Sequence, residues 1–190
     1  MEVLINLSNR HIHVSREDLD ILFGPGYELN NIKSLVQPGQ YAAEETVSIS
    51  GPKGGFDKVR ILGPVRKATQ CEVMQSDLYR LGLPDTPTRE SGDIAGSSAF
   101  TLTGPKGSIE KTEGLIVAQR HIHLDPPTAE QMGLANKQIV TLEAGSEKKK
   151  IAFRQVVVRV HKSYACECHL DFDEGNAAGL KNGAMGQITI

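Results

Sequence analysis

A single pattern, Arg-His-Ile-His followed by an aliphatic residue, occurs twice in this chain, at residues 10–14 and 120–124. Four of the six histidines of the chain lie in these two copies. In an extended strand, side chains two positions apart point to the same face, so each copy places two imidazoles on one face and an isoleucine on the other. The pattern therefore predicts two similar strands, each with its isoleucine in a core, in a chain built from two related halves.

The repeat extends into the residues that follow each copy. Ser15 and Asp125 are suited to cap a short helix, and Pro126 suits the first helical position of the second one. Glycines at positions 24 and 133 predict where the two helices end. Each half therefore contains a strand with two histidines, followed by a short capped helix.

A second phrase recurs farther along each half. Aligning the Gly-Leu pairs at 82–83 and 179–180 places Glu72 opposite His169. Histidine and glutamate both bind zinc, and three protein ligands with an open position are typical of catalytic zinc. Each half then supplies three candidate ligands: His11, His13 and Glu72 in one, and His121, His123 and His169 in the other. Only one set contains a carboxylate, which predicts centres of unequal charge and different roles.

Two alternatives remain open for these residues. The histidines could be core or hydrogen-bonding residues of a duplicated scaffold without a metal. Glu44 or Glu45 could also replace Glu72 as a ligand, although the repeat favours Glu72.

Four residues close to the motifs are interpreted as structural. Arg10 and Arg120 are expected to support the histidines or to pair with a nearby carboxylate. Cys168 precedes His169, so in a regular strand it faces away from a metal and acts as a small buried hydrophobe, whereas a bulge would make it a ligand. His161 has no counterpart in the other half and is expected on the surface.

Much of the remaining sequence consists of short alternating or β-branched segments. They lie at residues 46–49, 59–62, 100–103, 139–142, 156–160 and 187–190. Gly-Pro-Lys-Gly at 51–54 and 104–107 lacks the spacing of a phosphate-binding loop and predicts hairpin turns. Many short strands with few helices predict a mainly β fold of two small, related β-barrels with short capping helices.

The composition excludes several classes of function. A net charge of −2 gives no general affinity for polyanions, so we expect no nucleic-acid partner. No apolar run approaches the roughly 20 residues of a membrane span, and the first residues lack the pattern of a signal peptide, so we expect none. The three cysteines do not form a disulfide framework, which favours a reduced, cytoplasmic protein.

Six short motifs give the chain its resemblance to a known family. They lie at residues 8–13, 63–66, 70–72, 91–93, 120–123 and 169–171. In this order and spacing, over nearly the whole chain, they resemble the PduL-type phosphotransacylases, or phosphate propanoyltransferases.

The resemblance implies a first barrel formed by residues 1–9 and 119–190, and a second formed by residues 10–118. It implies two Zn²⁺ ions at the active site, held by the six candidate ligands, and reversible transfer of a propanoyl or acetyl group between coenzyme A and phosphate. Arg66 is then expected to bind phosphate, and Ser91 to be an active-site residue. The implied coenzyme A contacts are Ser8, Lys33, Arg60, Leu62 and Asn176.

The resemblance also implies a homodimer. Members packaged with bacterial microcompartment proteins often carry an N-terminal amphipathic segment, whereas here the first strand begins at once. We therefore expect a cytoplasmic enzyme, with association with microcompartment proteins as the alternative. Two other functions fit the same residues: a zinc-dependent hydrolase such as a thioesterase, and a non-enzymatic module stabilised by metal.

Overall fold

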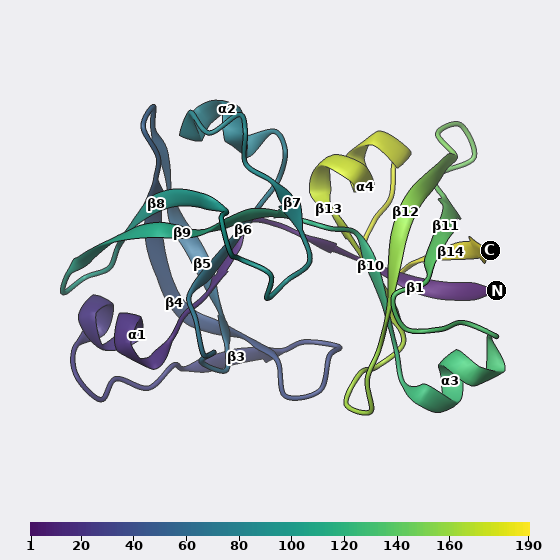
Figure 1. The fold of residues 1–190 in the computed structure, drawn as a ribbon, viewed down its shortest axis with the longest axis horizontal. Helices are drawn as coiled ribbons and strands as arrows, with labels where there is room; N and C mark the ends of the chain where they lie inside the picture. The colour runs from purple at the N-terminus through teal and green to yellow at the C-terminus, as the bar shows by residue number, and fades with distance from the viewer. The chain divides into compact units, whose positions relative to one another are not determined.

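The computed structural model describes all residues, Met1–Ile190, and has a mainly β fold with four short helices (Figure 1). The strands are β1 (Glu2–Ser8), β2 (His11–His13), β3 (Asn31–Ser34), β4 (Tyr41–Ser50), β5 (Gly55–Gly63), β6 (Gln70–Val73), β7 (Thr88–Arg89), β8 (Ser98–Thr103), β9 (Ser108–Ala118), β10 (His121–Leu124), β11 (Ile139–Ala144), β12 (Ile151–Val160), β13 (Glu167–Asp171) and β14 (Ala184–Thr189). The helices are α1 (Arg16–Phe23), α2 (Asp77–Leu81), α3 (Pro126–Gln131) and α4 (Phe172–Ala178).

The chain divides into two compact units. Unit 1 comprises Met1–Asn9, Val36–Pro38 and Gln119–Ile190, and unit 2 comprises Arg10–Leu35 and Gly39–Ala118. The segment Val36–Pro38 stands outside the boundaries expected from the sequence, because the side chain of Gln37 hydrogen-bonds to Ala165 and Glu167 of unit 1.

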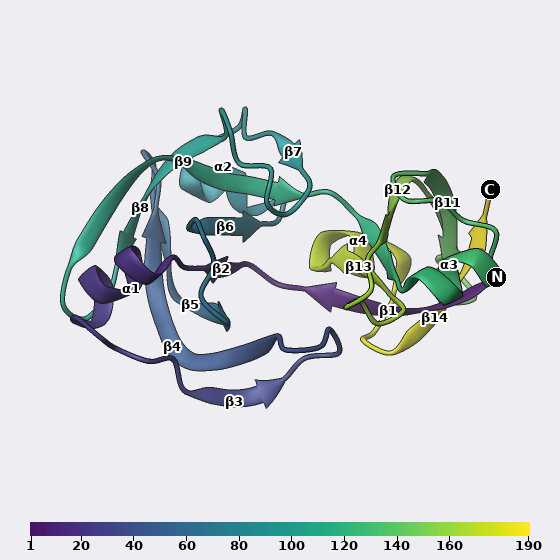
Figure 2. The same ribbon diagram turned by 60° about the horizontal axis from the view of Figure 1, so that its bottom comes forward.

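Unit 1 is a closed barrel with the strand order β1-β13-β10-β12-β11-β14. The ring closes because β14 pairs with β1 in antiparallel orientation. Its interior is filled by the alternate apolar residues of these strands, among them Ile5, Ile122 and Leu142. Figure 2 shows the six strands of this unit grouped together, although they come from the two ends of the chain.

Unit 2 contains a second closed ring, in the order β4-β5-β2-β6-β9-β8, since β8 pairs with both β9 and β4. The short strands β3 and β7 extend it by pairing with β4 and β9. The predicted fold class of two β-barrels with short helices is thus confirmed.

The two rings share one pairing pattern. The strand with two histidines, β2 or β10, pairs in parallel with β5 or β12 and antiparallel with β6 or β13. The strands that precede them are exchanged between the halves: β1 pairs with β13 and β14, and β9 pairs with β6 and β8. The sequence repeat is therefore a structural duplication in which each half contributes its own first strand, β1 or β9, to the barrel of the other half.

Most helix ends coincide with caps in the sequence, but α2 has no side-chain cap at its N-terminus and the C-cap of α3 is Met132, one residue before the predicted Gly133. The side chains of Ser15 and Asp125 accept hydrogen bonds from backbone N–H groups in the first turns of α1 and α3, as predicted. Helices α2 and α4 were not predicted, but the aligned glycines at 82 and 179 are their left-handed C-caps, with φ of 75° and 63°. None of the four helices has the length and apolar character that crossing a membrane requires.

The predicted strand segments all fall within observed strands, except that the final residue, Ile190, lies beyond β14. Both Gly-Pro-Lys-Gly segments are hairpin turns. In each, the first glycine donates its backbone N–H to the carbonyl oxygen of the last, at 2.9 Å for Gly51 and Gly54 and 2.9 Å for Gly104 and Gly107.

Ile122 is fully buried at the centre of unit 1. Replacing it with alanine is expected to destabilise this unit by about 2–5 kcal/mol, because the substitution leaves a cavity. Urea unfolding followed by circular dichroism measures this change. Ile139→Ala, at a side chain that is 47% exposed on β11, is the matched control and should cost about 0.5 kcal/mol or less. Equal costs for the two variants would contradict the assigned core.

Candidate metal centres

The strand register places the candidate ligands of each half side by side. On the antiparallel pair β2 and β6, His11 lies opposite Glu72 and His13 opposite Gln70. On β10 and β13, His121 lies opposite His169 and His123 opposite Glu167. Glu72 and His169 therefore occupy equivalent positions, as the alignment of the repeat predicts.

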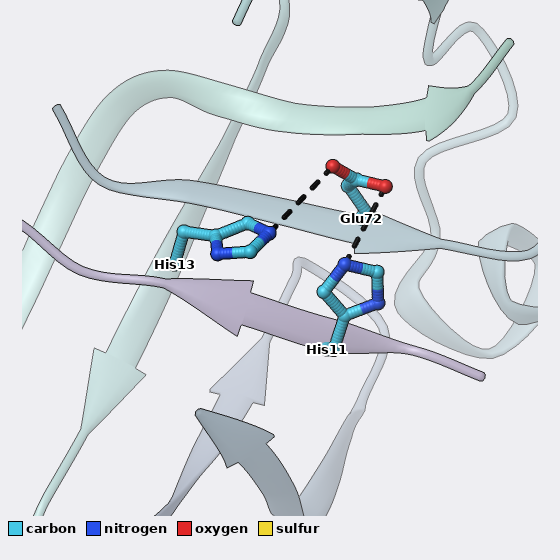
Figure 3. Close-up of side chains that lie close together, drawn as sticks. All are labelled: His11, His13 and Glu72. Carbon is cyan, nitrogen blue, oxygen red and sulfur yellow. Dashed lines mark ion pairs between the residues drawn. The ribbon is translucent and has the colours of Figure 1, made fainter. Parts of the chain in front are cut away.

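In unit 2, the side chains of His11, His13 and Glu72 converge in a buried cluster (Figure 3). The Nε2 atoms of His11 and His13 lie 3.5 Å and 4.0 Å from the two carboxylate oxygens of Glu72. Zinc ligands about 2.0–2.1 Å from the ion are about 3.3 Å apart at tetrahedral angles, so one ion fits between these three side chains.

His13 is held in the form that binds a metal. Its Nδ1 lies 3.1 Å from the carbonyl oxygen of Leu62, which can only accept, so Nδ1 carries the proton and Nε2 offers its lone pair. Burial, together with the neighbouring His11 and Arg66, lowers the pKa of His13 to about 3. The imidazole is therefore neutral at physiological pH.

In unit 1, ligand atoms of His123, Glu167 and His169 lie within 4.8 Å of one another. The Nε2 atom of His169 is buried and has no hydrogen bond of regular geometry, although Oε1 of Glu167 lies 2.8 Å away. Such an atom fits a metal ligand, because a buried nitrogen without a regular hydrogen bond is otherwise costly.

His121 belongs to the same neighbourhood. Its ring centroid lies 4.6 Å from that of His123 and 4.9 Å from that of His169. Nδ1 of His121 lies 2.8 Å from the carbonyl oxygen of Gln119, which leaves Nε2 as the lone-pair atom. The ring of Tyr164 packs on His123, with centroids 4.2 Å apart.

Glu167 was not among the predicted site residues. Burial by itself raises the pKa of this carboxyl, but the imidazole of His169 and the amides of Gln37 and Asn6 together lower it below its usual value. The second cluster thus also contains a carboxylate, which the sequence repeat does not predict. The signal that could have found Glu167 is its position two residues before His169, which places both side chains on one face of a strand.

Arg66 and Ser91 lie in a polar network that reaches the first cluster. Arg66 is anchored beside β2, because its backbone N–H donates to the carbonyl oxygen of Val14 at 2.8 Å. The hydroxyl oxygen of Ser91 accepts hydrogen bonds from Nη1 of Arg66 at 3.1 Å and from Nε2 of Gln70 at 2.9 Å. Gln70 also donates to Glu72 at 2.6 Å and so connects the serine to the cluster.

The other residues near the motifs have structural partners. Arg10 forms an ion pair with Asp77 of α2, and Arg120 forms one with Glu174 of α4, at 2.7 Å and 2.6 Å. Arg10 thus connects the start of β2 to α2 within unit 2, and Arg120 connects the start of β10 to α4 within unit 1.

None of the other three ligand candidates, Cys168, Glu44 and Glu45, joins a cluster. Cys168 packs in the core of unit 1, and burial raises the pKa of its thiol, so it offers no thiolate. Glu45 accepts hydrogen bonds from Tyr27 and Asn30, and Glu44 is exposed.

The expected coenzyme A contacts are divided between the units. Ser8 is on β1 and Asn176 on α4, both in unit 1. In unit 2, Arg60 pairs with His11 in the register of β5 and β2, and the carbonyl of Leu62 lies beside His13. Lys33 is exposed on β3.

The chain forms two related β-barrels, and each has a cluster of histidines and a carboxylate beside its His-x-His strand. These features define a two-barrel protein with candidate metal centres. The family model for phosphate propanoyltransferase matches residues 4–181. The chain belongs to this family and is an acyltransferase.

The relatives cover most of the chain and include proteins from distant bacteria. A phosphate propanoyltransferase of Thermotoga maritima is 49% identical over 183 residues, which are 96% of this chain and 87% of the relative. One of Rhodopseudomonas palustris is 50% identical over 95% of this chain and 79% of its own length. One of Listeria monocytogenes is 47% identical over 98% and 86%.

Proposed function

We propose that this protein catalyses reversible transfer of a short acyl group, propanoyl or acetyl, between coenzyme A and phosphate, with two bound Zn²⁺ ions. His11, His13 and Glu72 hold one ion, and His121, His123 and His169 hold the other. The observation that carries the proposal is the network in unit 2 that joins Arg66 and Ser91, through Gln70, to Glu72. When bound, zinc supplies a Lewis acid for the thioester carbonyl or a ligand for the coenzyme A sulfur.

Arg66 is suited to hold the attacking phosphate. Its guanidinium is planar and permanently charged, and it can donate two parallel hydrogen bonds to a phosphate. The backbone bond to Val14 and the side-chain bond to Ser91 fix its direction. Bound in this way, phosphate would be oriented for attack on the carbonyl carbon while coenzyme A leaves as a thiolate.

The hydroxyl group of Ser91 is suited to donate a hydrogen bond to a substrate. Both lone pairs of its hydroxyl oxygen accept hydrogen bonds, from Arg66 and Gln70. The hydroxyl proton therefore points toward another acceptor, which in this proposal is a phosphate or carbonyl oxygen of the substrates. Gln70 positions both Ser91 and Glu72, and its carbonyl oxygen accepts the backbone N–H of Gly92 at 2.6 Å.

The proposed coenzyme A contacts offer groups suited to this substrate. Lys33 and Arg60 supply positive charge for its phosphates, and Ser8 and Asn176 supply hydrogen-bonding groups. Leu62 supplies an apolar side chain next to the first cluster.

The test is the phosphate dependence of thiol release from acyl-coenzyme A. We expect thiol to appear only with phosphate present, with one acyl phosphate formed for each thiol. Release that ignores phosphate and yields no acyl phosphate would establish the thioesterase alternative, which the family relationship does not favour. Parallel assays with propanoyl- and acetyl-coenzyme A give the preference, which for one methylene is worth about 1–3 kcal/mol.

A further inference from the structure

The duplication places different residues at one pair of equivalent positions. Gln70 lies opposite His13 in unit 2, and Glu167 lies opposite His123 in unit 1. Each is two residues before the third candidate ligand of its unit, Glu72 or His169, and so shares its face of the strand. Unit 2 therefore has an amide followed by a carboxylate, and unit 1 has a carboxylate followed by an imidazole.

Glu167 is held in one orientation. Its side chain is 2% exposed. Nδ2 of Asn6 donates a hydrogen bond to Oε2, and Nε2 of Gln37 donates one to Oε1 at 2.6 Å. Gln37 is fixed in turn by Ala165, to whose carbonyl it donates at 2.9 Å and from whose N–H it accepts at 3.2 Å.

The held carboxylate faces the histidines. Oε1 of Glu167 lies 2.8 Å from Nε2 of His169, but the two atoms lack the angles of a regular hydrogen bond. His123 completes a group whose ligand atoms all lie within 4.8 Å of one another. A short separation without hydrogen-bond geometry is expected when two ligand atoms point toward a common ion rather than toward each other.

We propose that Glu167 is a direct carboxylate ligand of the metal in unit 1, oriented by Asn6 and Gln37. This inference rests on the proposed function, since it assumes that unit 1 binds a metal. The two centres then each contain one carboxylate, Glu72 in unit 2 and Glu167 in unit 1. Compared with Glu72 on β6, the carboxylate of unit 1 lies two residues earlier on the equivalent strand β13. The two metal centres then have the same net charge.

The proposal is tested by measuring zinc affinity in a protein whose metal centre in unit 2 has been removed, so that only unit 1 binds zinc. The background is His13→Ala, which removes a ligand of the other centre and should retain about one Zn²⁺ per chain by elemental analysis. Adding Glu167→Gln, which keeps the shape but removes the charge, should reduce the affinity of that ion by more than 100-fold in chelator competition. By comparison, loss of a group that only orients a metal ligand typically lowers metal affinity by about 10–100-fold. Adding Glu143→Gln, an exposed carboxylate of unit 1 paired with Lys150, is the matched control and should change nothing.

Replacing Glu167 with a different ligand type distinguishes direct coordination of the metal from a role in which Glu167 only orients another ligand. Glu167→His should retain zinc in the same background, because an imidazole can replace a carboxylate as a ligand but not as an acceptor for Asn6 and Gln37. Circular dichroism verifies that each variant is folded, and if Glu167→Gln does not fold, the histidine variant decides alone. Retention of full affinity by Glu167→Gln, or loss of zinc from folded Glu167→His, would overturn the inference. Fewer than two zinc ions in the unmodified protein would instead refute the proposed metal content.

Discussion

Replacing His13 with alanine is expected to abolish acyl transfer while leaving unit 1 loaded with metal. The side chain is one of three that converge in unit 2, and its neutral imidazole is directed by the carbonyl of Leu62. Without it, two ligands remain and the ion should be lost. A Lewis-acid contribution of about 4 kcal/mol corresponds to a fall in turnover of about a thousandfold.

Two measurements on the His13→Ala protein are needed together. The zinc content measured by elemental analysis should fall from about two ions per chain to about one. The rate of phosphate-dependent thiol release should fall as well. His161→Ala is the control, because His161 is exposed and belongs to neither cluster. Full activity of His13→Ala with both metals retained would show that this histidine is a structural residue.

Arg66→Lys is expected to weaken the use of phosphate specifically. Lysine keeps the positive charge but loses the two-pronged donor geometry, and a hydrogen bond to a charged group is worth about 1.5–3 kcal/mol. We therefore expect kcat/KM for phosphate to fall about 10–100-fold. The KM for acyl-coenzyme A should change little, because Arg66 is not among the proposed coenzyme A contacts.

The matched control for this substitution is Arg89→Lys. Arg89 lies in the same unit and forms an ion pair with Asp93, in which the two side chains are 41% and 55% exposed. Such pairs contribute little, so its kinetics should match those of the unmodified protein. An equal rise in KM for both substrates in Arg66→Lys would indicate a general distortion of the site rather than loss of a phosphate contact.

Local patterns in the sequence predict much of this fold. The His-x-His strands, the caps at Ser15 and Asp125 and the two hairpin turns are determined by neighbouring residues, and all are present. The exchange of β1 and β9 has no such local signal, since nothing within a strand specifies which distant strands it pairs with. The expectation of a discontinuous first barrel came from the family resemblance instead.

The candidate site divides in the same way. Glu72 and His169 were found because the repeat aligns two ligand types, and the strand register agrees with that alignment. Glu167 was missed because the repeat aligns it with Gln70, an amide that suggests no metal. The role of Gln37 depends on a loop between β3 and β4, and no periodic pattern reveals what a loop contacts.

The exchanged strands also determine when each barrel can close as the chain leaves the ribosome. Unit 2 has its last strand once β9 ends at Ala118, so its ring can form while the rest is still being synthesised. Unit 1 needs β14, which ends at Thr189, to pair with the first strand of the chain. Throughout elongation β1 is an unpaired apolar strand, of the kind that favours association with other chains. The yield of folded protein should therefore depend on factors that cover β1 until β13 and β14 have been synthesised.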